Sequence, residues 1–189
     1  MSDLRASVFE RFPVLETERL RLRATGPDDA EATLAVLSSE EVCRYYDLLP
    51  LIVREEASKL IASRAAAFAR EERIRWALAF RADDVVIGSC GLSRWGEEAA
   101  QAEVGYELAP AWQGHGLMRE ALSAVLGFGF DRMQLARVEA NVVPENEPSL
   151  RLLGRLGFRE IELRRGRGFW KGESHDLIYL LLDRKDWHE

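Results

Sequence analysis

Cysteine and histidine are scarce in this sequence, and the shortage excludes two classes of site. The two cysteines, Cys43 and Cys90, are too few and too far apart for a disulfide framework or a thiolate metal centre. The three histidines, His115, His175 and His188, show no spacing typical of metal ligands. We therefore expect no metal, and we expect the Cys90 thiol to pack within a strand rather than to carry an acyl group.

Long apolar runs and an excess of positive charge are also missing. The longest charge-free apolar stretches span residues 124–130 and 177–182, whereas a membrane helix needs about 20 apolar residues. The opening residues, MSDLR, lack the apolar core of a secretory signal, so we expect a cytoplasmic protein without membrane contact. Lysine and arginine total 26 against 32 acidic residues, and the formal net charge of -6 argues against direct nucleic-acid binding.

The sequence does contain the mixed periodicity of one α+β domain. Its 189 residues, 47% hydrophobic and 31% charged, suffice for a single soluble domain with a substantial core. We expect this domain to cover residues 15–189 and to follow a loose segment at residues 1–14. Strands are expected at 20–23, 76–80, 85–92, 103–108, 137–143, 158–164 and 174–182, and helices at 25–37, 54–70, 117–130 and 146–156.

The order of these elements predicts the topology of the sheet. The strands at 76–80, 85–92 and 103–108 follow one another through short turns and are expected to form an antiparallel meander. The helix at 117–130 separates the strand at 103–108 from the strand at 137–143, and strands joined in this way run parallel with a right-handed crossover. We expect a mixed, twisted sheet of about six to seven strands, flanked by about four helices.

A glycine-rich turn, Gln113–Met118, joins a predicted strand to a predicted helix. Its glycines allow tight backbone conformations, and the unpaired N–H groups that open a helix attract phosphate. A Walker loop is excluded because Gly-Lys-Ser/Thr is absent, and a dinucleotide fingerprint is excluded because Arg119 stands where a further glycine is needed. From these residues alone, a phosphate cradle and a tight turn without a ligand both remain open.

A resemblance to a known family decides between these alternatives. The segment Glu103–Leu108, followed by Q-x-x-G-x-M at Gln113–Met118, resembles the acetyl-CoA motif of the GNAT superfamily of N-acetyltransferases. The longer string from Gly105 to Leu122 is similar to the RimJ/RimL branch, which acetylates the α-amino ends of ribosomal proteins. Further stretches that fit the family in its order lie at residues 15–20, 141–158 and 175–187, so the resemblance covers almost the whole chain.

The resemblance implies acetyl-CoA as cosubstrate. In this family the two central parallel strands splay apart, and the pantetheine arm of coenzyme A lies in the gap against the strand that is here 103–108. Backbone N–H groups of residues 113–118 would bind the pyrophosphate, although His115 is equally well interpreted as an exposed turn residue. The implied cofactor-binding residues are Tyr106, Leu108, Gln113, Gly114, His115, Gly116, Leu117, Met118, Asn141, Asn146 and Ser149.

Acetyl transfer to an amine needs a neutral nucleophile, and Glu103 is the candidate general base. Neutralising a lysine at pH 7.5 costs roughly 4 kcal/mol, whereas an α-amine costs less than about 1 kcal/mol, so a weak base suffices for an α-amine. Glu103 begins the cofactor strand, and no basic residue interrupts Glu97, Glu98, Glu103 and Glu107 along the chain. Such a patch could attract a cationic amine; a solvated strand edge is the alternative.

Ser149 is the candidate donor of a proton to the departing thiolate. Many GNAT enzymes use a tyrosine for this step, but the matching position here is Leu153. Some RimL-like relatives carry a catalytic carboxylate after the last helix, and residues 164–168 read Arg-Arg-Gly-Arg-Gly instead. The alternative for Ser149 is a first-turn hydroxyl that satisfies backbone donors. A backbone N–H near Leu108 would polarise the thioester carbonyl.

The favoured function is direct acetyl transfer, in a ternary complex, to a protein N-terminal α-amine of the ribosomal type. A small amine such as a polyamine, an amino acid or an aminoglycoside is an alternative acceptor. A non-catalytic acyl-CoA-binding protein of the same fold is a second alternative, because the family's tyrosine and late carboxylate are missing. The acceptor site is expected at residues 38–54 and 164–175, in a monomer or homodimer. Candidates for its lining are Tyr45, Tyr46, Trp95 and Trp170.

Overall fold

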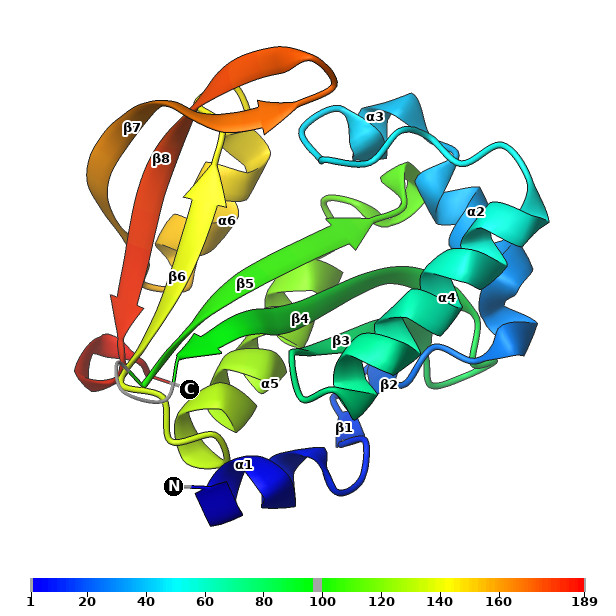
Figure 1. The fold of residues 1–189 in the computed structure, drawn as a ribbon, viewed down its shortest axis with the longest axis horizontal. Coiled ribbons are helices and arrows are strands. Elements are labelled where there is room, and N and C mark those ends of the chain that lie inside the picture. The colour runs from blue at the N-terminus through cyan, green and yellow to red at the C-terminus, as the bar shows by residue number, and fades with distance from the viewer. Residues whose placement is uncertain (1, 97–99, 189) are drawn as a thin grey trace.

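The computed structural model describes residues 2–96 and 100–188, which form one eight-stranded sheet with helices on both faces (Figure 1). The strands are β1 (Leu15–Glu16), β2 (Leu20–Arg23), β3 (Arg73–Phe80), β4 (Val86–Gly96), β5 (Gln101–Leu108), β6 (Arg137–Val142), β7 (Arg159–Trp170) and β8 (Glu173–Asp183). The α-helices are α1 (Ser2–Phe9), α2 (Ala30–Leu37), α3 (Glu40–Cys43), α4 (Arg54–Ala69), α5 (Leu117–Asp131) and α6 (Glu147–Arg155). None of the helices in these residues is long and apolar enough to cross a bilayer.

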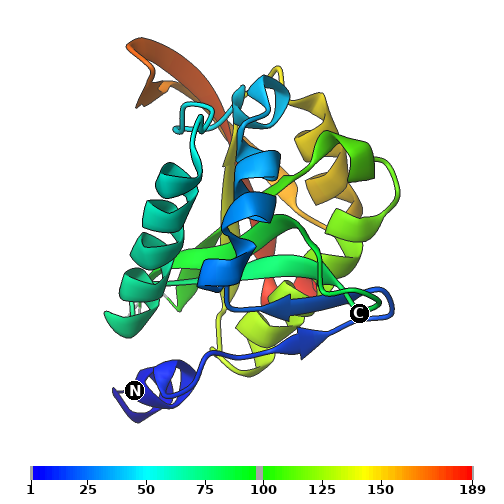
Figure 2. The same ribbon diagram turned by 90° about the vertical axis from the view of Figure 1, so that its right-hand side faces the viewer.

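The sheet confirms the predicted mixed α+β architecture, with one strand more than the upper expectation. Its strand order is β1-β2-β3-β4-β5-β6-β8-β7, and β2 to β5 form the antiparallel meander. Helix α4 covers one face, whereas α5 and α6 cover the other (Figure 2). Helix α5 buries its apolar face against the sheet, as its amphipathic pattern predicts. On this face, Phe128 contacts the fully buried Trp76 edge-on, with 5.5 Å between the ring centroids.

Strands β5 and β6 form the predicted parallel pair, and they remain paired only at their beginnings. Gln101, Ala102 and Glu103 pair with Arg137, Val138 and Glu139, and no pairing between the two strands follows. Beyond this point β5 stays bonded to β4, whereas β6 stays bonded to β8. The two strands therefore diverge toward their carboxyl ends, as Figure 1 shows, and each leaves backbone polar groups facing the gap.

The N-terminal segment carries a helix that the sequence did not predict. Helix α1 lies below the sheet in Figure 1, and its Val8 is buried with only 6% of its surface exposed. Phe9 and Phe12 pack against the same core, and the indole Nε1 of Trp76 donates to the Pro13 carbonyl at 2.7 Å. The weak apolar periodicity of this segment gave no signal, because its few apolar side chains fit a surface that only the rest of the fold supplies.

The hairpin of β7 and β8 is longer than expected, because β7 continues to Trp170 rather than ending near residue 164. Residues 164–168 are rich in arginine and glycine and show no strand alternation, and here the pairing with β8 is irregular: Arg164 and Gly168 pair with Leu177 and His175, with a register shift between them. The hairpin reaches toward α3 in Figure 1, where Lys171 Nζ donates to the Cys43 carbonyl at 2.6 Å. This contact connects two segments that lie on opposite sides of the gap between β5 and β6.

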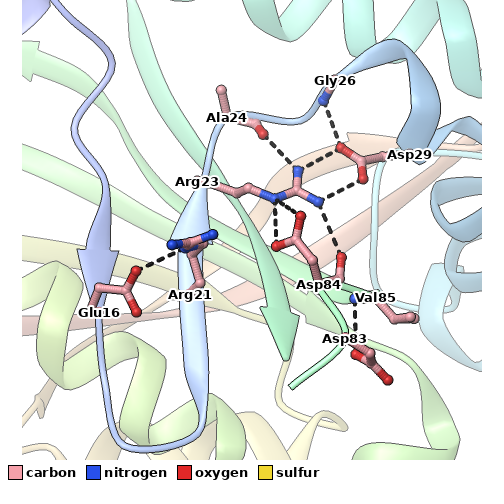
Figure 3. Close-up of polar contacts among 9 residues, drawn as sticks. All are labelled: Glu16, Arg21, Arg23, Ala24, Gly26, Asp29, Asp83, Asp84 and Val85. Atoms are coloured by element: carbon pink, nitrogen blue, oxygen red, sulfur yellow. Dashed lines mark hydrogen bonds and ion pairs between the residues drawn. The ribbon is translucent and has the colours of Figure 1, made fainter. Parts of the chain in front are cut away.

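An ion cluster around Arg23 fixes the point at which the chain leaves the sheet for α2 (Figure 3). The guanidinium of Arg23, at the end of β2, donates to the Asp29 carboxylate at 2.7 and 2.9 Å, and to Asp84 in the β3–β4 turn at 3.0 and 3.1 Å. The backbone N–H of Gly26 also donates to Asp29, at 2.7 Å. Burial opposes the charged Asp29, but these hydrogen bonds outweigh it and hold the pKa of its carboxyl below the usual value.

Candidate active site

The glycine-rich turn lies where β5 ends and α5 begins, and most of its amides have no assigned protein acceptor among the described residues. Gly114 and Gly116 have φ angles of 78° and 76°, which only glycine adopts at little cost. The N–H of Gln113 is already bonded to the Pro110 carbonyl, and the next helical bond runs from Glu120 N to Gly116 O. Among the described residues, no protein acceptor is assigned to the N–H groups from Gly114 to Met118. This stretch therefore offers unpaired N–H donors at the position where the sequence predicts a phosphate cradle.

The side chains of the predicted cradle residues shape the turn from within. Gln113 Nε2 donates to the Leu108 carbonyl at 3.1 Å, which links the turn to the last residue of β5. The imidazole Nδ1 of His115 lies 2.8 Å from the Gln113 carbonyl, and the ring is exposed. Leu117 and Met118 are buried in the core, so they can offer a ligand only their backbone.

A second segment, which contains Thr17 and Arg19, is hydrogen-bonded to this region, and the sequence analysis assigned no function to it. The Glu120 carboxylate accepts from the Thr17 hydroxyl, from the Arg19 backbone N–H at 2.8 Å and from Arg19 Nε at 2.7 Å. Arg19 Nη1 also donates to the His115 carbonyl at 3.0 Å. Burial opposes the charged form of Glu120, but the bonds from Thr17 and Arg19 outweigh it and lower the pKa of its carboxyl. A guanidinium therefore stands beside the cradle.

Two predicted site residues meet across the gap between the splayed strands. Tyr106, on β5, and Ser149, in the first turn of α6, have their hydroxyl oxygens 2.7 Å apart. Burial raises the pKa of Tyr106 to about 12, although the bond to Ser149 opposes the rise. Asn146 caps α6 by accepting from the Ser149 N–H at 3.3 Å, so the Ser149 hydroxyl is free to face Tyr106. A tyrosine hydroxyl thus reaches this region from β5, although position 153 holds leucine.

The predicted base, Glu103, is engaged by two partners. Its Oε2 accepts from Arg94 Nη1 at 3.0 Å and from Asn141 Nδ2 at 3.2 Å. Its backbone belongs to the last paired position before β5 and β6 diverge. Glu103 and Glu107 therefore both have arginine partners in the fold, although no basic residue stands between them in the sequence. Glu97 and Glu98 lie outside the described residues.

Glu107 forms the centre of a buried charge cluster on the α4 face of β5. Its carboxylate bonds Arg64 of α4 at 3.0 Å, and it also bonds Arg75 of β3 and the Ser89 hydroxyl of β4. The side chains of Glu107, Arg64 and Arg75 are only 5%, 9% and 9% exposed. Arg75 further donates to Ser89 Oγ and to the Gly105 carbonyl, both at 2.8 Å. Sequence reasoning missed this cluster because its members come from four separate elements.

Tyr46, in the loop after α3, is influenced by the charges of this cluster. The nearby guanidinium of Arg75, and then that of Arg64, hold the pKa of the phenol below its ordinary value, although burial opposes the shift. Two buried guanidinium groups therefore share the Glu107 carboxylate, and their charges lower the pKa of the Tyr46 phenol.

The expected acceptor region closes over the gap. Tyr45 Oη donates to the Glu145 carbonyl at 3.3 Å, and Lys171 bonds Cys43, so the segment after α3 is held from two sides. A cavity of about 470 Å³ lies here, lined by residues 47–51 together with Glu56 and Lys171. Of the two candidate tryptophans, Trp170 stacks on His175 in the same hairpin, with 4.2 Å between ring centroids. Trp95 packs against Phe9 of α1 at the other end of the sheet, so it does not line this region.

Burial accounts for the second cysteine. Cys90 is fully buried in β4, and burial raises the pKa of its thiol to about 12. The thiolate that a covalent acetyl-cysteine route requires is therefore absent near neutral pH. Within residues 2–96 and 100–188, no group of three or more His, Cys, Asp or Glu side chains is arranged to hold a metal ion.

Comparison with known proteins agrees with this geometry. A family model described as "Acetyltransferase (GNAT) domain" matches residues 19–159. The chain belongs to the GNAT acetyltransferase family. The Bacillus subtilis N-acetyltransferase YoaA is 36% identical over 176 residues, which cover 93% of this chain and 99% of YoaA. Escherichia coli [ribosomal protein uS5]-alanine N-acetyltransferase is 34% identical over 84 residues, 44% of this chain and 43% of that protein.

A solved GNAT structure shares the fold at low sequence identity. Mycobacterium smegmatis RimJ in complex with CoA-disulfide superposes with a TM-score of 0.84 at 20% identity, and the match covers 93% of this chain and 89% of that one. At this identity the likeness establishes the fold alone. Family membership and the named N-acetyltransferase relatives together make this GNAT chain an N-acetyltransferase.

Proposed function

We propose that this GNAT protein transfers the acetyl group of acetyl-CoA directly to the α-amine of a protein N-terminus. The observation that carries the choice of acceptor is the pairing of both acidic residues of β5 with arginine. Glu103 is bonded to Arg94, and Glu107 is bonded to Arg64 and Arg75. A lysine acceptor would need a strong, free base, since neutralising it at pH 7.5 costs roughly 4 kcal/mol. An α-amine needs far less assistance.

The free amides from Gly114 to Met118 would hold the pyrophosphate of acetyl-CoA. The pantetheine arm would then lie along the unpaired edge of β5, with its sulfur beside the Tyr106 and Ser149 hydroxyls. The cavity at residues 47–51 would receive the first residues of the acceptor chain through the apolar surface of Leu48, Leu49 and Leu51. The uS5-alanine relative, which is named for an N-terminal substrate of this kind, supports a ribosomal-type acceptor.

A thiol-release assay tests this proposal. Purified protein and acetyl-CoA are mixed with short peptides that begin with Ala, Ser or Met, and with the same peptides acetylated at the N-terminus. Spermidine, free amino acids and an aminoglycoside are added in parallel. We expect release of coenzyme A with free N-termini, and mass spectrometry should place the acetyl group on the α-nitrogen.

Two results would contradict the proposal in different ways. Faster turnover of a small amine than of every peptide would make the protein a small-molecule acetyltransferase. Tight acetyl-CoA binding in calorimetry, with no thiol release for any acceptor, would identify a non-catalytic acyl-CoA-binding protein of this fold.

A further inference from the structure

Arg19 holds a guanidinium group beside the glycine-rich turn, and two of its three nitrogens are bonded to the protein. Its Nε donates to the Glu120 carboxylate at 2.7 Å, and its Nη1 donates to the His115 carbonyl at 3.0 Å. Within residues 2–96 and 100–188, no acceptor is assigned to its remaining nitrogen, Nη2. Because bonds to two different residues fix the plane of the guanidinium, they also fix the direction in which Nη2 can donate.

This unpaired nitrogen lies next to Gly116, the last residue before α5. Apart from the chain neighbours of Gly116, the nearest described atom to a Cβ built on this residue is Arg19 Nη2, at 3.6 Å. Gly116 has no side chain to fill the space between them. The side chain of Arg19 is 44% exposed, so a ligand can reach it from solvent.

Glu120, the acid in the first turn of α5, does not occupy the open end of this helix. A carboxylate there is favoured by the helix dipole and could accept from the unpaired N–H groups. The Glu120 carboxylate instead accepts from the Thr17 hydroxyl and from the backbone N–H and Nε of Arg19. The N–H groups of the turn are therefore left to another anion, and Arg19 offsets the charge of Glu120 beside them.

We propose that Arg19 binds the diphosphate of acetyl-CoA through Nη2, as a side-chain donor beside the backbone N–H groups of the turn. This inference rests on the proposed binding of acetyl-CoA at that turn. Because Nη2 and the N–H groups around Gly116 lie side by side, one phosphate group can accept from both. Hydrogen bonds from guanidinium to phosphate are charge-assisted and directional, so they add both affinity and orientation.

Coenzyme A carries a second group of the same chemistry, the 3′-phosphate of its ribose. The diphosphate is the favoured partner because Arg19 is bonded to the turn itself, through the His115 carbonyl, and stands beside Gly116. A derivative of acetyl-CoA that lacks the 3′-phosphate keeps the diphosphate, so it separates the two groups.

Calorimetric titration with acetyl-CoA and with 3′-dephospho-acetyl-CoA tests the proposal without an acceptor amine. Removal of Arg19 would also free the Glu120 carboxylate, which repels a diphosphate, so Arg19→Ala is made in a Glu120→Gln background. Relative to Glu120→Gln alone, we expect the Kd of both compounds to rise about tenfold in about 50 mM salt. The difference should shrink in about 1 M salt, because ions screen a contact between charges.

Arg21→Ala in the same background is the matched control. Arg21 lies two residues further along the chain, its side chain is 50% exposed, and it pairs with Glu16 and not with the turn. Both Kd values should stay within about twofold of those of the background. Thermal unfolding checks that every variant is folded. Should Arg19→Ala fail to fold, Arg19→Lys replaces it; this change keeps the charge but loses the fork of donors, and both Kd values should rise about threefold.

Three results would overturn the proposal. A loss of affinity for acetyl-CoA that is absent with the dephospho derivative would assign Arg19 to the 3′-phosphate. An equal loss in Arg21→Ala would reveal a general effect of charge. A loss that stays unchanged in about 1 M salt would show that Arg19 only supports the turn, since such support is not screened. Absence of acetyl-CoA binding in the wild type would instead contradict the proposed function, so the two failures are distinguishable.

Discussion

The Arg19 guanidinium is bonded to the Glu120 carboxylate, with 2.7 Å between Nε and Oε2, although the two residues stand 101 positions apart. Glu120 belongs to the first turn of α5, and Arg19 belongs to the turn that precedes β2. Arg19 also holds the His115 carbonyl, so it connects the N-terminal hairpin to the cradle. A Cβ added at Gly116 would lie only 3.6 Å from Arg19 Nη2. Arg19 thus fixes the cradle and adds positive charge beside it.

Glu120→Ala should weaken acetyl-CoA binding without changing the chemical step. The change removes the acceptor of three hydrogen bonds and leaves Arg19 free to swing away from the cradle. We expect the Kd for acetyl-CoA to rise about tenfold, with kcat at saturation within about twofold of the wild type. The free energy of unfolding should fall by about 2 kcal/mol, since bonds to a charged group are lost. Calorimetry, kinetics and urea unfolding measure the three quantities.

Glu72→Ala is the matched control, because Glu72 also pairs with an arginine but lies exposed at the end of α4, away from the cradle. Such a surface pair is worth less than about 1 kcal/mol. The control should bind acetyl-CoA as the wild type does. Equal weakening of acetyl-CoA binding in the two variants would show that the Arg19–Glu120 pair has no specific role in binding.

Gly116→Asp should abolish acetyl-CoA binding and leave the fold intact. An added Cβ meets no atom closer than 3.6 Å, and aspartate tolerates a φ of 76° at a cost of about 1 to 2 kcal/mol. Its carboxylate would occupy the cradle, pair with Arg19 and repel a diphosphate. We expect a loss of affinity of at least about 100-fold in calorimetry, or ~2.7 kcal/mol.

Gly172→Asp separates backbone strain from charge in the cradle. Gly172 has a φ of 81° and open surroundings in the β7–β8 turn. It should lose similar stability and keep the wild-type affinity for acetyl-CoA. Unchanged binding in Gly116→Asp would mean that the diphosphate lies elsewhere.

Tyr106→Phe and Ser149→Ala should each slow the departure of the thiolate. Their hydroxyls lie 2.7 Å apart and form one proton path, so the double variant should be no slower than the slower single variant. We expect a drop in kcat of about tenfold, because a thiolate leaves readily without much acid assistance. Tyr106, with a pKa of about 12, should stay protonated and add no alkaline limb below pH 10.

Tyr179→Phe is the control for the loss of a phenol. Tyr179 lies on β8 under the Arg164 guanidinium, whose central carbon is 3.6 Å from its ring centroid, and phenylalanine keeps that ring. Its kcat should match the wild type. Full additivity of the Tyr106 and Ser149 effects would show two independent roles instead of one path.

The sequence was sufficient to predict those parts of the fold that depend on interactions between residues close together along the chain. The β5–α5 junction was predictable because a strand pattern, two glycines and an amphipathic helix follow one another along the chain. The splay between β5 and β6 came from the family resemblance, since periodicity shows that strands exist and not where their pairing stops. Helix α1 gave no signal because its apolar residues acquire a partner surface only in the folded domain.

The candidate site divides in the same way. The amides of the predicted cradle belong to one short segment, so the sequence could predict them together. Arg64 and Glu107 lie 43 positions apart, and their bond depends on α4 crossing the face of β5, which no spacing encodes. The Tyr106–Ser149 contact also spans 43 positions, so each residue could be predicted singly but their contact could not. Charge pairs between distant elements need the tertiary structure before they can be assigned.

Asp29→Asn should destabilise the protein at neutral pH and much less in acid. The carboxylate bonds Arg23 and the Gly26 N–H, and its pKa is lower in the folded chain than in the unfolded one. A group with a depressed folded pKa contributes stability above its unfolded pKa, about 3.9, and loses it as pH falls through the folded value. Above pH 5 we therefore expect a constant deficit of about 2 kcal/mol in the variant, which narrows below pH 4.

Asp84→Asn provides the control on the same guanidinium. Asp84 also bonds Arg23, but its side chain is 52% exposed, so water screens the pair and the loss should stay under about 1 kcal/mol. Urea unfolding at several pH values measures both variants. Equal deficits, or an Asp29→Asn deficit that persists unchanged at pH 3, would show that the charge of Asp29 does not hold the entry to α2. A larger, pH-dependent loss of stability in Asp29→Asn alone would show that the buried Arg23–Asp29 pair, and not the exposed Arg23–Asp84 pair, holds the entry to α2.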